Sequence, residues 1–264
     1  MDERKGRNWF VDALCVFFGL GAWISVNGMW VELPLLVQTL PEGWALPSYM
    51  SIVIQIANVG PIAYSVARLA VPRLADPVRC IYALMAIGVT SSLLMVLFWN
   101  STSTLGESQH STAMLSLLFF LSLVDCTSSV LFMPFMARFR RLYLTSYLIG
   151  EGLSGFLPSL FALSQGVGGN PECRNISGQI ESYYPPPRYS VSQFFMVLLA
   201  LMVTSATAFL LLHKTSAAAR ERVDGPKNTT TGRCLSSIDN VTFVASSDDP
   251  EGDRGAREAF PIKS

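Results

Sequence analysis

The sequence carries little charge where its apolar residues gather. Charged residues make up 14% of the chain, and the 19 basic and 19 acidic side chains cancel. A soluble domain typically has about 25% charged residues. Segments of helical length up to residue 213 are almost free of charge, whereas the stretch after Lys214 is rich in it. This distribution is typical of an integral membrane protein with a polar tail, and the lack of a basic excess argues against a nucleic-acid partner.

Cysteine and histidine are also scarce. The five cysteines form no CxxC pair and there are only two histidines, which argues against a zinc site. Three of the cysteines lie in apolar segments, where Cys usually acts as a small hydrophobic residue. No nucleophile elbow or phosphate loop occurs in the strand-and-helix context that such a motif requires. We therefore predict that the chain is not an enzyme and has no cofactor.

Six apolar segments are each about long enough to cross a bilayer as a helix. They cover residues 11–31, 48–69, 80–99, 113–133, 144–163 and 191–212. We predict an all-α integral membrane protein with a six-helix transmembrane bundle at residues 9–213, after a short cytosolic segment at 1–8. A cleaved signal peptide is the alternative for the first run, but that run exceeds a signal core of about 7–15 residues and ends at no small-x-small site.

Orientation follows from the basic residues of the connections. Lys and Arg gather before the first segment and after the second, fourth and sixth, and they are fewer in the other connections. Both termini are therefore predicted to be cytosolic. The glycosylation sequons at Asn100 and Asn175 fall in connections predicted to be external. Residues 214–264, with unused sequons at Asn228 and Asn240, lack apolar periodicity and are predicted to be a disordered cytosolic tail.

The first segment is unusual for a plain membrane anchor. Trp23, Asn27 and Trp30 fall on one stripe of a 3.6-residue period, together with Gly19 and Asp12. An asparagine at membrane depth needs a partner, because lipid supplies none. We interpret the stripe as the first wall of a solute path in a membrane transporter.

Polar side chains in the second and fourth segments extend this hypothesis. Gln55 and Asn58 lie near one face and form either a hydrogen-bonding wall for a solute or contacts between helices. Asp125, near Thr127, is the only acid of its segment. A charged carboxylate at that depth costs about 2.5–3.5 kcal/mol even on a lenient scale, so it is protonated, paired or beside water. Asp125 is either functional or satisfied by neighbouring hydroxyls.

The fifth segment contains a Gly-rich string that fits the dinucleotide pattern GxGxxG, from Gly150 to Gly155. We reject that function, because the motif needs a preceding strand and a βαβ unit. Close helix packing through small residues is the physical interpretation. Glu151, the second buried acid, is a ligand contact, a proton carrier or a structural partner, and its position does not rank these roles.

The combined inventory of amides, hydroxyls and indoles, without an intramembrane Lys or Arg, suits a flat, polar, nearly neutral organic solute. Several long strings then carry a resemblance over about residues 8–213. These strings are 18–23, 26–34, 40–44, 46–49, 124–129, 132–135 and 150–155. They resemble the riboflavin transporters of solute carrier family 52.

The resemblance implies a plasma-membrane carrier of riboflavin, a neutral tricyclic molecule with a ribityl chain. The leading hypothesis is facilitative or proton-linked riboflavin uptake, in which Trp23 would stack on the rings and Asp125 or Glu151 would contact hydroxyls or carry a proton. The ring edges or the ribityl chain would bind Asn27, Gln55, Asn58 and Thr127. The resemblance also implies about eleven spans, related to nucleoside-transporter and major-facilitator architectures, which work by alternating access.

The sequence departs from the family by ending in what resembles the central cytosolic loop. The resemblance therefore predicts the N-terminal half of a carrier, as a truncated isoform or an incomplete gene model. The alternative function is a non-transporting six-span regulator or a cell-surface receptor. The transport hypothesis allows self-association, and the regulator hypothesis includes pairing with a full-length carrier.

Overall fold

The apolar runs form long helices, because in lipid each backbone N–H and C=O must be bonded inside the protein. A computed structural model describes residues 7–71, 75–105, 108–167, 172–176, 179–183 and 186–223. Its helices are α1 (Trp9–Leu20), α2 (Ile24–Thr39), the 3-10 helix η1 (Gly43–Ala45), α3 (Leu46–Ala57), α4 (Val59–Ala70), α5 (Pro77–Phe98), α6 (Thr112–Met136), α7 (Arg141–Gln165), α8 (Val191–Lys214) and α9 (Ser216–Arg220). Its strands are β1 (Ser103–Leu105), β2 (Ser108–His110), β3 (Glu172–Ile176) and β4 (Gln179–Tyr183).

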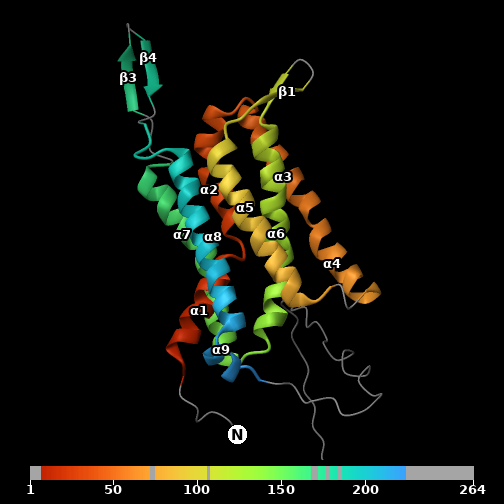
Figure 1. The fold of residues 1–264 in the computed structure, drawn as a ribbon. Coiled ribbons are helices and arrows are strands. Elements are labelled where there is room, and N and C mark those ends of the chain that lie inside the picture. Colours follow the sequence, from red (N-terminus) through yellow and green to blue (C-terminus); the bar gives the residue numbers. More distant parts are fainter. Residues whose placement is uncertain are drawn as a thin grey trace, which may run out of the picture. The chain divides into compact units, whose positions relative to one another are not determined.

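The described residues all belong to one of the two units into which the chain divides, residues 1–225. In that unit α5 packs between α6 and α8, and α1 packs between α7 and α8 (Figure 1). The helices α3 and α4 pack on α6, and α2 packs on α6, α7 and α8. The helix α6 therefore stands between the α3–α4 side of the bundle and the α2–α7 side.

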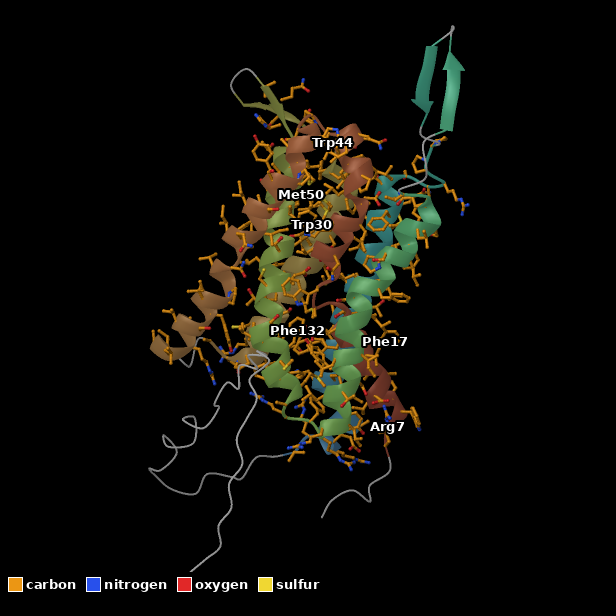
Figure 2. The ribbon with its side chains drawn as sticks, turned by 180° about the vertical axis from the view of Figure 1, so that it is seen from behind. Arg7, Phe17, Trp30, Trp44, Met50 and Phe132 are labelled. Carbon is orange, nitrogen blue, oxygen red and sulfur yellow. The ribbon has the colours of Figure 1, made fainter. Side chains whose placement is uncertain are left out.

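The two ends of the bundle differ in their connections. Both strand pairs, β1–β2 and β3–β4, lie at one end, and the start of α1, the end of α4 and α9 lie at the other (Figure 1). Figure 2 labels Trp44 at the first end and Arg7 at the second. The connections predicted to be external and those predicted to be cytosolic thus separate to opposite ends.

The prediction of one continuous helix over residues 11–31 is wrong. The chain leaves the helical conformation at residues 21–23, and α1 and α2 meet at an angle of 51°. The α1 C-cap, Gly21, has no room for a side chain, because a Cβ there would collide with Ser205 of α8. The predicted stripe is therefore divided: Asp12 and Gly19 belong to α1, whereas Asn27 belongs to α2.

An aromatic cluster fills the core below this break. Phe18 of α1 lies 4.6 Å from Phe132 of α6 and 5.4 Å from Phe209 of α8, measured between ring centroids. Tyr147 of α7 lies 5.6 Å from the same Phe18 ring. Tilted and offset pairs at such distances add stabilisation beyond that of burial. The cluster joins α1, α6, α7 and α8.

The glycines of α1 and α7 allow these two helices to touch along their backbones. A Cβ added to Gly150 would collide with the carbonyl oxygen of Val16, and one added to Gly19 would collide with the carbonyl oxygen of Tyr147. Small residues at such positions let helix backbones approach closely. The packing interpretation of the Gly150–Gly155 string is confirmed at Gly150.

Four described helical segments are long and apolar enough to cross a membrane, and a fifth does so if α1 and α2 count as one bent span. They include α5, α6 and α8, whose bounds agree closely with the predicted segments, and the α3–α4 pair. The helix α7 is not among them, because glycines, serines and Glu151 lower its apolarity. The fold is thus that of a mostly helical membrane protein with two short strand pairs. The predicted six spans exceed the four or five that the described helices provide.

The described helices extend past the predicted start of the tail. The helix α9 follows α8 after one residue, Thr215, and Arg222 forms a β-bridge with Phe139. Arg222 also donates to the carbonyl oxygens of Leu212 and His213, at 2.8 and 3.1 Å. Residues 224–264, with most of the predicted tail, and residues 1–6 lie outside the described residues.

Candidate functional site

The break between α1 and α2 is held by side chains from other helices. The carboxylate of Asp125 on α6 accepts the N–H of Val26 at 2.8 Å, in the first turn of α2. The hydroxyls of Ser128 and Ser205 donate to the carbonyl oxygens of Ala22 and Phe18, at 3.0 and 2.8 Å. The backbone groups that a broken helix exposes are thus satisfied from α6 and α8.

Asp125 is fully buried at this break. Its Oδ2 caps α2, while its Oδ1 has no hydrogen-bond partner in the part of the chain that the structure describes. Because the side chain reaches a helix N-terminus, the positive end of the helix dipole faces the carboxylate. The geometry gives Asp125 a clear structural contact, and its predicted contact with a solute stays a prediction.

The helix α2 packs on α7, and Asn27 of the predicted stripe lies next to Gly155 there. We call Trp23, Asn27 and Trp30 of the stripe, together with Glu151 and Gly155 of α7, the α2–α7 seam. A Cβ added to Gly155 would lie 3.4 Å from the Asn27 side-chain nitrogen. Glu151 precedes Gly155 by one helical turn, so both lie on the same face of α7. All but Trp30 are half-buried, and Trp30, labelled in Figure 2, is more open.

Two polar groups of the α2–α7 seam are unsatisfied. Within the described ranges, neither the Asn27 amide nor the Glu151 carboxylate has a hydrogen-bond partner or an ion pair. Both lie near the middle of the bundle, where an unpaired polar group costs free energy. A polar ligand, water or another chain would satisfy them.

Gln55 and Asn58, predicted as an amide wall, lie apart from the α2–α7 seam. Both side chains are exposed, and the Asn58 amide donates to the Gln55 side-chain oxygen at 3.2 Å. Asn58 is the residue at which α3 ends and α4 begins. With α6 between them and α2, these amides do not share a contact with Asn27.

Thr127 faces a third region. It lines an apolar groove of about 450 Å³ between α4, α5 and α6, against Gly60 of α4. Because residues two apart on a helix point about 200° apart, Thr127 and Asp125 face nearly opposite sides of α6. The structure thus places Asn27 next to Gly155 of α7, and it places Gln55, Asn58 and Thr127 on the other side of α6.

Ser205 and Ser128 hold the break, and no pattern in the sequence indicates this role. Their hydroxyls look like those of any membrane helix, and their targets lie 187 and 106 residues away in the chain. Trp30 could have been predicted as a site residue, because it continues the spacing of Trp23 and Asn27.

Among the described residues, no group of three or more His, Cys, Asp or Glu side chains is placed to hold a metal ion.

Glu42 joins the connection after α2 to the start of α6. The N–H and the hydroxyl of Ser111 donate to its carboxylate at 2.6 and 2.8 Å, and His110 Nδ1 lies 3.7 Å away. Burial raises the pKa of Glu42, but the hydrogen bonds from Ser111 outweigh burial, so the pKa lies below its ordinary value. The charged carboxylate therefore stabilises the fold.

The variant Glu42→Gln should lower the thermal midpoint at pH 7, and its deficit should shrink in acid. A carboxyl whose pKa is lowered by folding stabilises the fold above its ordinary pKa, and this contribution is lost as the pH falls through the lowered value. The measurement is thermal unfolding of both proteins in detergent between pH 7 and pH 3. Ser111→Ala, which keeps the N–H donor, should give a smaller deficit of the same sign. A deficit that does not change with pH would contradict this role for the carboxylate.

The comparisons with known proteins agree on one family. The family profile "Solute carrier family 52, riboflavin transporter" matches residues 7–253. Riboflavin transporter member 3-B of Danio rerio is 46% identical over 224 residues, covering 80% of this chain and 49% of the relative. Human member 3 is 39% identical over 237 residues, covering 76% and 50%, and riboflavin transporter rft-1 of Caenorhabditis elegans is 40% identical over 208 residues, covering 79% and 48%. The chain spans about half the length of these curated relatives.

Proposed function

Since the chain belongs to the riboflavin transporters of solute carrier family 52, we propose that its bundle forms one wall of a path that carries riboflavin across the plasma membrane. The family is one of transporters, in agreement with the prediction that the chain is not an enzyme. Riboflavin is then a transported substrate and not a cofactor.

The α2–α7 seam is the observation that carries the proposal. It combines two indoles with an unpaired amide and an unpaired carboxylate near mid-bundle. A flat aromatic ring system gains by stacking on indole, and its polar edges need hydrogen-bond partners. Riboflavin offers both, together with ribityl hydroxyls. The seam is therefore matched in chemistry to the solute named for the relatives.

The residues take distinct parts in this proposal. Trp23 stacks on the rings, Asn27 binds a ring edge, and Glu151 binds ribityl hydroxyls or carries a proton. Asp125 acts through the break: by holding the start of α2, it fixes the direction of Trp23 and Asn27. Contacts along the α3–α4 side of α6 would come from Gln55, Asn58 and Thr127.

The proposal includes the membrane topology. The chain crosses six times, with α1 and α2 as one bent crossing and α7 as the least apolar crossing. Both termini are cytosolic, and the hairpin end, with the sequons at Asn100 and Asn175, is external. Alternating access needs a second set of helices facing the α2–α7 seam. A second copy of the chain or a full-length carrier would supply it.

The variant Trp23→Ala should weaken riboflavin binding about two- to tenfold, because an aromatic pair contributes about 0.5–1.5 kcal/mol. The measurement is quenching of riboflavin fluorescence on titration with purified protein in detergent. Trp44→Ala is the control, because Trp44 is 90% exposed at the hairpin end. The double variant Trp23→Ala/Asn27→Ala should weaken binding further. If the wild type and the double variant bound riboflavin with equal affinity, the α2–α7 seam would not be the riboflavin site.

The second candidate is a non-transporting membrane module that pairs with a full-length carrier. Its support is that another chain packed against the α2–α7 seam would also satisfy the unpaired Asn27 amide and Glu151 carboxylate. Expression of residues 1–264 in cells, with uptake of labelled riboflavin and surface biotinylation, separates the two. Uptake above background supports transport by this chain, whereas surface protein without uptake supports the module.

A further inference from the structure

A second candidate site lies far from the α2–α7 seam, at the end of the bundle that holds Arg7. There a surface hollow of about 610 Å³ lies between the start of α1 and α9. Its lining consists of Arg7, Asn8, Trp9, Phe10, Ala217, Arg220 and Glu221. We call this region the α1–α9 hollow. Nothing in the solute path described above uses it.

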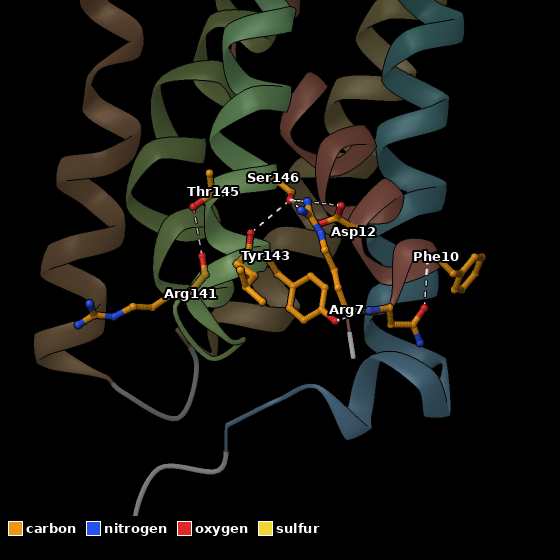
Figure 3. A network of polar contacts seen from close by, with 9 residues as sticks. Arg7, Phe10, Asp12, Arg141, Tyr143, Thr145 and Ser146 are labelled. Atoms are coloured by element: carbon orange, nitrogen blue, oxygen red, sulfur yellow. Dashed lines mark hydrogen bonds and ion pairs between the residues drawn. The ribbon is translucent and has the colours of Figure 1, made fainter. Parts of the chain in front are cut away.

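The α1–α9 hollow is electropositive. Arg220 is exposed, and among the described residues its guanidinium has no carboxylate partner. Arg7 binds Asp12, which also accepts from the hydroxyl of Ser146, but its side chain stays 41% exposed (Figure 3). The only acid in the lining, Glu221, is buried and pairs with Arg140 at 3.3 Å. An anion that enters therefore meets exposed positive charge and no exposed carboxylate of the lining.

The same hollow has an apolar rim. Trp9 is 73% exposed and Phe10 50% exposed, at the point where α1 begins. The Arg7 guanidinium lies 4.9 Å from the centroid of the Trp9 ring. Exposed aromatic residues next to arginines at the end of a membrane helix are typical of the layer in which lipid headgroups meet acyl chains. A soluble anion would bind the arginines and leave both aromatic residues without a role.

We propose that the α1–α9 hollow binds an anionic phospholipid from the adjacent leaflet. The phosphate and the headgroup lie against Arg220 and Arg7, and the acyl chains run along Trp9 and Phe10. The predicted topology makes this the cytosolic leaflet, which carries the anionic lipids of the plasma membrane. The bound lipid bridges α1 and α9, which are joined here by no backbone hydrogen bond between their described residues. The proposal does not depend on riboflavin.

The test is lipid binding by purified residues 1–264 in detergent, measured by native mass spectrometry. The probes are dioleoylphosphatidylserine, dioleoylphosphatidylcholine and inorganic phosphate. Phosphatidylserine should bind about fivefold more tightly than phosphatidylcholine, and Arg220→Ala should remove this preference. Arg220→Lys should keep it, because a lysine also pairs with a phosphate. Trp9→Ala should weaken binding of both lipids.

The matched control is Arg141→Ala. Arg141 is exposed at the same end, carries the same charge and lies outside the lining, and its side chain points away from Arg7 (Figure 3). Unchanged lipid preference in Arg141→Ala, with unchanged thermal midpoints throughout, supports the site. Equal losses in Arg141→Ala and Arg220→Ala would overturn it in favour of diffuse surface charge. Phosphate binding as tight as that of phosphatidylserine and insensitive to Trp9→Ala would overturn it in favour of a free anion.

Discussion

Replacing Gly150 with alanine is expected to force α1 and α7 apart and to lower the thermal midpoint sharply. The new Cβ would collide with the carbonyl oxygen of Val16 and lie 2.8 Å from its carbonyl carbon and 3.0 Å from its Cα. These are backbone atoms of a packed helix, so no rotamer change relieves the clash. Overpacking of a tight contact costs about 1–3 kcal/mol or more, and the displaced α1 also carries Phe18, the centre of the aromatic cluster.

Gly152→Ala is a matched control two residues away. A Cβ at Gly152 meets no heavy atom within 4 Å. Alanine favours a helix over glycine by about 1 kcal/mol, so this variant should melt at the wild-type temperature or slightly above. The measurement is the thermal midpoint of purified fluorescent-protein fusions in detergent, together with their yield. If Gly150→Ala and Gly152→Ala melted alike, the close approach of α1 and α7 would be wrong.

Asp125→Ala is expected to be the second severe variant. It removes the acceptor of the Val26 N–H at the break and leaves that donor unpaired inside the bundle. A buried unsatisfied donor costs about 1–3 kcal/mol. Lower yield and a lower thermal midpoint should follow. Riboflavin binding should also fall, because Trp23 and Asn27 lose the fixed start of α2.

Asp125→Asn separates the capping role from proton transfer. The asparagine oxygen still accepts the Val26 N–H, so stability should return close to the wild-type value, whereas an amide cannot carry a proton. Ser122→Ala is the control on the same helix, because the buried Ser122 hydroxyl has no described partner. Stable Asp125→Asn that binds riboflavin supports capping. Loss of stability in Asp125→Asn equal to that in Asp125→Ala would contradict it.

The parts of the fold that depend on local composition could be predicted from the sequence. The helices α5, α6 and α8 each come from an uninterrupted apolar run, and their bounds agree with the prediction within a few residues. The break at residues 21–23 could not be predicted, because the groups that satisfy it come from α6 and α8. The helix α9 was missed for a similar reason, since its short segment is held next to residues of the α6–α7 connection.

The candidate site was predictable only within single helices. The 3.6-residue spacing places Asn27 and Trp30 near one face of α2, because that relation is internal to one helix, whereas Trp23 lies just before the start of that helix. The contact of Asn27 with Gly155 depends on which helix packs beside α2, and one sequence does not encode that relation in any local pattern. The amides of Gln55 and Asn58 show how far a pattern within one segment can predict a site. They hydrogen-bond to each other, but α6 separates them from the α2–α7 seam.

The break between α1 and α2 also sets an order of events during synthesis. Its exposed carbonyl and amide groups are satisfied by Asp125, Ser128 and Ser205, which leave the ribosome long after the first crossing has entered the bilayer. A newly inserted first crossing surrounded only by lipid has no such partners. An unbroken helix is then the more stable conformation, because it pairs the backbone groups within the segment. We therefore expect the bend to form only after α6 has entered the bilayer, and we expect a nascent chain stopped before residue 125 to hold a straight first crossing.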